Sequence, residues 1–249
     1  MCGRYASSRR PEDLVDEFDV IESRVQDALD ASYNVAPTDS VYAIVERPPR
    51  GEDDDGGPRR ELRTVRWGLV PSWAKDPSIG NRLINARMET VAEKPAYKKA
   101  FQKRRCLLPA DGYYEWYASD QTTARGKPVK QPYFIRPKDH GVMAMAGLYE
   151  FWPDPAKADD DPSRWLWSCT VITTDAEDDV GRIHDRMPLM VERDRWAEWL
   201  DPTRSGSLDL LVPAMPGRLE AYPVSRLVSN VRNNGPELVE PLPLEESQR

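Results

Sequence analysis

The pattern of apolar and polar positions consists of short apolar runs separated by turn residues. Many runs are rich in β-branched and aromatic side chains, which is typical of strands. The predicted strands cover residues 41–45, 62–70, 106–109, 113–117, 133–136, 142–148 and 166–173. The strands at 106–109 and 113–117 meet at a turn, Ala110-Asp111-Gly112.

Helical spacing is confined to short segments. Residues 11–18 place Leu14, Val15 and Phe18 on one face, with Pro11 in the first turn. Further short helices are predicted at 90–93, 96–102 and 193–200, whereas residues 33–37 have an irregular pattern. Many strands, few helices and no βαβ alternation predict an α+β fold: a single domain with a curved, barrel-like, mostly antiparallel sheet flanked by short helices.

Two segments without periodicity interrupt this pattern. Residues 48–60 are rich in Pro, Gly and Asp, and residues 153–164 form a second acidic stretch. We expect one domain over residues 1–249, with a core from about 2 to 239 and mobile loops at about 48–60 and 153–164. The acidic tail, residues 240–249, is expected to be poorly ordered.

The composition narrows the class of protein. The 249 residues include eight Trp and ten Tyr, which suits a packed core. No apolar run reaches the ~18 residues of a transmembrane helix, and no signal region is present, so we expect a cytoplasmic protein without membrane contact. Three cysteines without CxxC spacing and two histidines give no disulfide framework and no metal site, and no cofactor is expected.

The net charge of −7 counts against a protein that binds nucleic acid over its whole surface. The acidic residues cluster at 52–55, 159–161 and 245–246, so a local basic groove stays compatible with that charge. A basic run, Lys98, Lys99, Lys103, Arg104 and Arg105, lies at the end of a predicted helix.

The N-terminus offers unusual chemistry. Because small second residues favour removal of the initiator methionine, Met1, the mature chain is expected to begin at Cys2. Cys2 then carries an α-amine of pKa about 8 and a thiol of pKa about 8.5 on one residue. An aldehyde can form a Schiff base with the amine, which the thiol closes into a thiazolidine ring. Taken alone, a cysteine at position 2 is most often incidental.

Two further side chains are candidates for proton transfer. Glu115 lies among Tyr113, Tyr114, Trp116 and Tyr117, which desolvate a carboxylate and raise its pKa. The alternative is a strand whose outward face carries the glutamate. His184, between Arg182 and Asp185-Arg186, suits a proton shuttle, although a solvated loop histidine is the commoner case.

A third group suits binding and orientation. The Asn34 amide can orient the amine or thiol of Cys2, with an Asx-turn as the alternative and more common use. Residues 81–87 supply amide and guanidinium donors for phosphate, or surface ion pairs. Trp73, on a turn after Pro71, offers a face for base stacking, or fills the core.

These residues belong to a longer ordered series of motifs. In chain order they are Met1-Cys2-Gly3-Arg4-Tyr5, Asn34-Val35-Ala36-Pro37, Trp67-Gly68, Asn85-Ala86-Arg87-Met88-Glu89-Thr90, Ala110-Asp111-Gly112-Tyr113-Tyr114-Glu115-Trp116, Ile183-His184-Asp185-Arg186-Met187-Pro188, Pro223-Val224-Ser225 and Val228-Ser229-Asn230-Val231. The series resembles the SOS response-associated peptidase (SRAP) family from residue 2 to about residue 239.

The resemblance implies a protein that shields abasic sites in single-stranded DNA through a covalent thiazolidine crosslink to Cys2. It implies that Glu115 is a catalytic glutamate that handles the α-amine proton. It implies that His184 protonates the sugar oxygen during ring opening, and that Asn34 orients Cys2. The family name adds self-removal of Met1.

The resemblance also implies DNA contacts. Arg4, Asn85 and Arg87 match positions that hold phosphates, Trp73 matches an aromatic that stacks on a neighbouring base, and Thr173 matches an active-site threonine. The expected protein is a monomer without an obligate protein partner, associated with the nucleoid when bound to DNA. A basic DNA contact expected soon after Thr90 is replaced by the Lys94-Pro95 neighbourhood.

Two other functions fit the same residues. One is a cysteine peptidase that uses Cys2, His184 and Glu115 on peptides. The other is a non-covalent binder of single-stranded or modified DNA in which Cys2 is dispensable. Replacing Cys2 by serine separates both from the crosslinking function.

Overall fold

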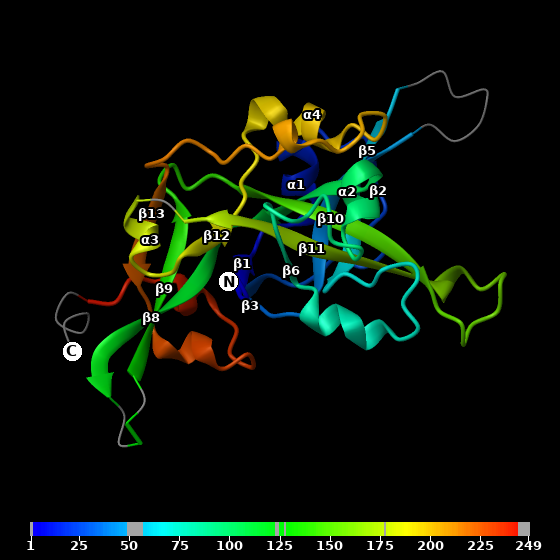
Figure 1. Cartoon of the computed structure of the whole chain (residues 1–249). Coiled ribbons are helices and arrows are strands. Elements are labelled where there is room, and N and C mark those ends of the chain that lie inside the picture. The colour runs from blue at the N-terminus through cyan, green and yellow to red at the C-terminus, as the bar shows by residue number, and fades with distance from the viewer. Residues whose placement is uncertain (1, 49–56, 123–124, 127, 177, 244–249) are drawn as a thin grey trace.

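The computed structural model describes residues 2–48, 57–122, 125–126, 128–176 and 178–243, and its strands form two sheets (Figure 1). The five-stranded sheet has the order β13 (Leu219–Pro223), β9 (Pro128–Pro137), β8 (Gly112–Thr122), β1 (Tyr5–Ser7) and β3 (Ser32–Val35). The larger sheet has the order β12 (Arg186–Pro188), β11 (Trp165–Asp175), β10 (Met143–Pro153), β7 (Arg105–Ala110), β4 (Ser40–Arg47), β5 (Arg59–Trp67) and β2 (Glu22–Ser23), with β6 (Asn85–Arg87) beside β11.

The larger sheet closes on itself. Strand β5 pairs in parallel with β11, through Arg66 opposite Ser168 and Trp67 opposite Cys169, so that β5, β4, β7, β10 and β11 form a barrel. Gly68 ends β5 with a φ of 128° and donates its N–H to the Cys169 carbonyl at 2.8 Å. A Cβ at Gly68 would lie 2.6 Å from the Gly80 carbonyl oxygen, so only glycine fits this closure.

Short helices lie between the strands. The α-helices are α1 (Pro11–Glu17), α2 (Lys98–Lys103), α3 (Asp178–Gly181) and α4 (Trp196–Leu200). The 3₁₀ helices are η1 (Pro77–Arg82), η2 (Pro162–Arg164), η3 (Arg193–Arg195), η4 (Leu208–Leu210), η5 (Arg226–Ser229) and η6 (Pro236–Val239). The predicted fold class, a curved and mostly antiparallel sheet with short helices, is confirmed.

Three local predictions need correction. The segment predicted as irregular at 33–37 contributes to β3, which pairs with β1 through Val35 opposite Tyr5. The helix predicted at 90–93 is a series of hydrogen-bonded turns, because Pro95 keeps the residue before it out of helical geometry. The strand predicted at 62–70 ends at Trp67, where Gly68 takes its positive φ.

The chain passes from one sheet to the other at Asp111. Strand β7 pairs with β10 in the barrel, whereas β8 pairs with β9 and β1 in the second sheet. The Asp111 N–H donates to the Ala6 carbonyl at 2.8 Å, which ties this crossing to β1. The predicted turn at 110–112 is therefore a junction between sheets, and it brings β8 beside the N-terminal segment.

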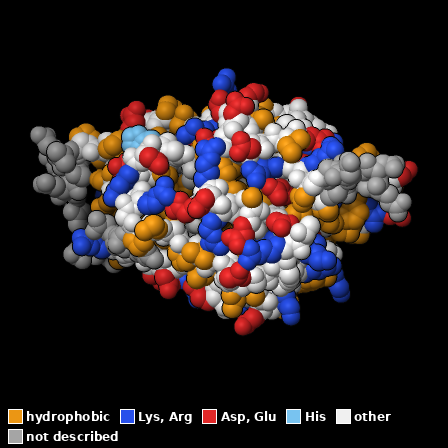
Figure 2. Space-filling model, turned by 90° about the horizontal axis from the view of Figure 1, so that it is seen from above, with side chains coloured by type: hydrophobic (Ala, Val, Ile, Leu, Met, Phe, Trp, Pro, Cys, Tyr) orange, Lys and Arg blue, Asp and Glu red, His pale blue; other side chains and the backbone are white. Residues whose placement is uncertain are grey.

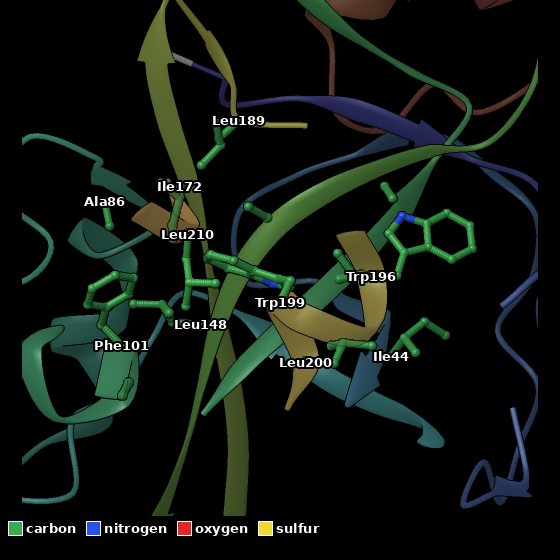
Figure 3. Close-up of a cluster of buried hydrophobic side chains, with 14 of the residues drawn as sticks. Ile44, Ala86, Phe101, Leu148, Ile172, Leu189, Trp196, Trp199, Leu200 and Leu210 are labelled. Atoms are coloured by element: carbon green, nitrogen blue, oxygen red, sulfur yellow. The ribbon is translucent and has the colours of Figure 1, made fainter. Parts of the chain in front are cut away.

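Two buried clusters fill the barrel and its surroundings. In the first, Trp199 and Leu200 of α4 pack with Phe101 of α2 and with Leu148 and Ile172 from the barrel strands (Figure 3). The Trp199 indole N–H donates to the Cys106 carbonyl at 2.8 Å, which satisfies its polar atom inside the core.

The second cluster lies beneath the N-terminus. It contains Cys2, Tyr5, Trp67, Tyr113 and Cys169, all fully or almost fully buried. The Tyr5 and Trp67 rings meet edge to face with centroids 5.1 Å apart. The start of the chain is thus packed against buried aromatic rings.

The predicted loops and tail are described in part. Residues 49–56, within the loop at 48–60, lie outside the described residues, as do residues 244–249 of the tail. In the segment 153–164, the Asp154 N–H donates to the Arg164 carbonyl at 2.8 Å. In the tail, the Leu242 N–H donates to the Pro223 carbonyl at 2.9 Å. Within the described ranges, no helix is long and apolar enough to span a bilayer.

Candidate active site at the N-terminus

Cys2 lies at the junction of the two sheets. Strand β1 runs antiparallel to β8, with Tyr5 opposite Tyr113, and the Tyr114 N–H donates to the Arg4 carbonyl at 2.9 Å. The chain before β1 therefore continues along β8 toward Glu115. Asn85 of β6 donates its amide to the Cys2 carbonyl at 2.7 Å, so the barrel also holds this residue.

The Cys2 thiol is fully buried, and its surroundings disfavour a thiolate. Burial raises the pKa of the Cys2 thiol far above its usual value, and the negative charge of Glu115 raises it further. The thiol therefore keeps its proton at neutral pH. This arrangement differs from cysteine nucleophiles that are activated by a lowered pKa.

Glu115 lies on β8 and is buried, with only 4% of the residue exposed. Burial raises the pKa of Glu115, and His184 partly opposes this shift. The predicted desolvation is therefore found, and the alternative of an outward-facing glutamate is wrong. Because Glu115 influences the pKa of Cys2 and His184 influences that of Glu115, the three residues form one electrostatically coupled group.

His184 lies in the turn between α3 and β12 and is partly buried. The Arg186 backbone N–H donates to Nδ1 at 3.0 Å, which leaves Nε2 to carry the proton of a neutral ring. The Asp185 carboxylate lies 2.9 Å from the same Nδ1 and supports the ring when it is protonated. The ring thus has partners for both of its protonation states, unlike a freely solvated histidine.

Asn34 is buried in β3 and holds distant segments together. Its Oδ1 accepts a hydrogen bond from Arg4 at 2.7 Å. Its amide donates to the carbonyls of Val228 at 3.3 Å, Asn230 at 3.0 Å and Asn233 at 2.8 Å. The Asx-turn alternative is therefore wrong. The hydrogen bonds of this side chain go to Arg4 rather than to Cys2, so any effect on Cys2 passes through the intervening Gly3.

Replacing Asn34 by aspartate is expected to destabilise the fold by about 3 kcal/mol, because a buried carboxylate would then face three carbonyl oxygens with no proton to donate. Chemical denaturation measures this loss. The matched control is Asn230→Asp, since the exposed Asn230 side chain acts only as an acceptor, from the Arg232 N–H. The control should stay within about 0.5 kcal/mol of the wild type. Equal stabilities for the two variants would contradict this role of Asn34.

Two of the residues predicted to hold phosphates, Asn85 and Arg87, lie on β6. Strand β6 runs parallel to β11 and places Arg87 opposite Thr173. Arg87 is exposed and Asn85 is partly buried, whereas Thr173 is only 1% exposed. Arg4 is already engaged, since its guanidinium donates to Asn34 and to the Val228 carbonyl.

Trp73 is 59% exposed on the turn that follows β5. The alternative of a core tryptophan is therefore wrong, and the ring face is open to a ligand. The adjacent Ala74 carbonyl accepts a hydrogen bond from the Trp152 indole at 2.6 Å, which fixes the turn to the barrel.

Arg186 was noted in the sequence only as a neighbour of His184. Its guanidinium donates to Glu89 at 2.8 and 3.1 Å, to Asp175, and to the Thr173 carbonyl at 2.7 Å. These contacts connect the His184 turn to the segment after β6. The sequence signal was a single arginine in a polar motif, which gave no indication of a partner 97 positions away.

The face over α1 and α4 carries charged side chains of both signs. Lys and Arg side chains there are interspersed with Asp and Glu (Figure 2). This face has no broad positive field, in agreement with the net charge of −7.

The described residues contain no group of three or more His, Cys, Asp or Glu side chains arranged to hold a metal ion.

The fold and the site together define a single-domain β-barrel protein whose candidate reactive groups surround a buried cysteine at position 2. Residues 1–231 match the family described as SOS response associated peptidase (SRAP), and the chain belongs to this family. The resemblance found in the motifs is thereby confirmed.

Relatives from distant organisms support this assignment. The chain is 38% identical over 243 residues to the Abasic site processing protein YoaM of Bacillus subtilis, covering 96% of this chain and 98% of that protein. It is 36% identical over 240 residues to the Abasic site processing protein HMCES of Gallus gallus, covering 86% of this chain and 67% of that protein. A crystal structure of a Bacteroides thetaiotaomicron protein matches with a TM-score of 0.77 and 26% identity, covering 97% of this chain and all of the other.

Proposed function

We propose that this protein processes abasic sites in single-stranded DNA by forming a thiazolidine crosslink through Cys2 after removal of Met1, which shields the lesion. The observation that carries the proposal is the coupling of the buried Cys2 thiol to Glu115 and, through it, to His184. The names of the YoaM and HMCES relatives, both abasic site processing proteins, support the same substrate.

The order of the chemical steps follows from the pKa values. Because the pKa of the Cys2 thiol is raised, the α-amine is the first nucleophile. His184 donates a proton to the ring oxygen of the closed sugar, the bond from this oxygen to the anomeric carbon breaks, and the anomeric hydroxyl releases its proton to water as the aldehyde forms. The amine attacks the aldehyde carbon, and the hydroxyl of the resulting carbinolamine takes up a proton and leaves as water to give an iminium ion.

The thiol then completes the ring. Its sulfur bonds to the iminium carbon, and its proton passes to the Glu115 carboxylate, whose raised pKa makes it a stronger proton acceptor than an exposed carboxylate. The product is a thiazolidine, with water as the only leaving group. No oxidant, metal or cofactor takes part in these steps.

In this proposal the DNA contacts need no base-edge recognition. Arg87, Asn85 and Thr173 hold phosphates beside the lesion, Arg4 supports them from the segment before β1, and Trp73 stacks on a neighbouring base. Such contacts suit a strand in which one base is missing. The binding partner is therefore single-stranded DNA, and a monomer suffices for it.

Intact-mass analysis tests the proposal. The purified protein is mixed with a short single strand that carries one abasic site, and also with the same strand without the lesion. The expected product has the mass of the protein without Met1 plus the DNA minus one water, survives heating and forms only with the lesion. Absence of this product, despite confirmed removal of Met1, would overturn the proposal, and cleavage of added peptides would then favour a peptidase.

A further inference from the structure

The structure divides the basic run at 98–105 into two groups. Arg104 pairs with Glu150 at 2.7 Å, and Arg105 is buried, with its guanidinium bonded to backbone carbonyls of the α2 and α4 regions. These two arginines hold the fold together. Lys98, Lys99 and Lys103 are exposed, and none of them forms a salt bridge in the described part of the chain.

These three lysines share a hollow with Trp73. The hollow has a volume of about 480 Å³, and Trp73 and Pro95 line it together with the three lysines. Residues 73–105 contain nine Lys and Arg against three Asp and Glu, in a chain whose net charge is −7. The hollow therefore combines an open aromatic face with a local positive charge, which is the combination that single-stranded DNA requires.

The hollow is connected to the site at Cys2 through Asn85. The Asn85 amide donates to the Cys2 carbonyl at 2.7 Å, and the Asn85 carbonyl accepts from the Tyr97 hydroxyl at 3.0 Å. Tyr97 directly precedes α2, which carries the lysines. Asn85 is therefore bonded both to Cys2 and to the residue from which α2 begins.

We propose that the DNA strand carrying the lesion continues from the Cys2 site across Trp73 into this hollow, where Lys98, Lys99 and Lys103 bind its flanking phosphates. This inference rests on the proposed function and extends it to the length of the substrate. The protein then prefers abasic strands with several nucleotides on one side of the lesion, whatever their bases, because lysines contact phosphate and stacking accepts any base.

The test compares two abasic strands, of about five and about fifteen nucleotides, which lie near the lower and the upper end of single-strand site sizes. The variant Lys98→Ala/Lys99→Ala/Lys103→Ala is set against a control, Arg125→Ala/Lys130→Ala/Lys138→Ala, which removes three exposed positive charges elsewhere. Affinity is measured by fluorescence anisotropy over a range of salt concentrations. Adduct yield is measured on both strands.

The α2 variant should bind the longer strand about tenfold more weakly. The slope of log association constant against log salt concentration should be less steep by about 2, the value for three lost phosphate contacts on a single strand. On the short strand it should match the wild type, and the control should match on both. Lys→Arg changes at the three positions should restore the long-strand affinity. An unchanged salt slope, or an equal loss on both strands, would overturn the inference.

Failure of the proposed function is distinguishable. If no adduct forms on either strand, the crosslinking proposal fails. The salt slope on an undamaged strand of the longer length still decides whether the α2 lysines bind phosphates.

Discussion

Replacing Cys2 by serine is expected to abolish the heat-stable adduct with an abasic strand. The serine variant keeps an α-amine that can form a reversible imine, but it has no thiol to close the ring. Borohydride reduction should therefore trap the variant on the DNA, whereas heating without reduction should release it. Gel electrophoresis with and without borohydride measures both outcomes.

Two controls separate this chemistry from a loss of structure. Cys169→Ala removes another buried thiol, in the same cluster as Cys2, and should keep the heat-stable adduct. A chain that retains Met1 keeps the Cys2 thiol but carries its α-amine on another residue, so it should form none. A stable adduct with the serine variant would rule out the thiazolidine.

Replacing Glu115 by glutamine is expected to slow adduct formation about 100-fold, the lower range for loss of a general acid or base. The amide fills the same space but accepts no proton from the thiol. In the wild type the rate should fall as the pH drops through the raised pKa of Glu115, and the variant should lack this limb of the pH profile. Single-turnover kinetics between about pH 5 and about pH 9, a range that includes the pKa of an ordinary α-amine, measure this dependence.

The same substitution, Glu115→Gln, is expected to raise the stability of the fold although it slows adduct formation. Burial raises the pKa of Glu115 in the folded protein above its value in the unfolded chain, so the folded state holds this proton more tightly. The free energy of unfolding of the wild type therefore falls as the pH rises through the folded-state pKa and the buried Glu115 carboxyl loses its proton. Glu115→Gln should be more stable than the wild type above that pKa and equally stable below about pH 4, where both states are protonated.

Glu46 supplies the control for these two effects. Burial raises the pKa of Glu46 as well, but it lies on β4 and pairs with Arg60 at 2.9 Å. Glu46→Gln should change stability and leave the rate of adduct formation unaltered. A normal rate for Glu115→Gln would exclude Glu115 as the proton acceptor.

The sequence by itself determined the local features and the chemistry available. The apolar periodicity of residues 11–18 predicted α1, and the alternating runs predicted the main strands, because both depend on neighbouring residues. The adjacency of amine and thiol on Cys2 is a covalent fact that needs no fold. The ordered motifs identified the family, and the aromatic neighbours of Glu115 indicated the direction of its pKa shift.

The tertiary structure decided what these residues contact. The amide of Asn34 bonds to carbonyls at 228–233, and β5 closes the barrel on β11, because strand pairing depends on burial between segments far apart in the chain. The basic run at 98–105 looked uniform in sequence. Only packing showed that Arg105 is buried while Lys98 and its two neighbouring lysines face solvent beside Trp73, since side-chain exposure is set by the partners that cover each face.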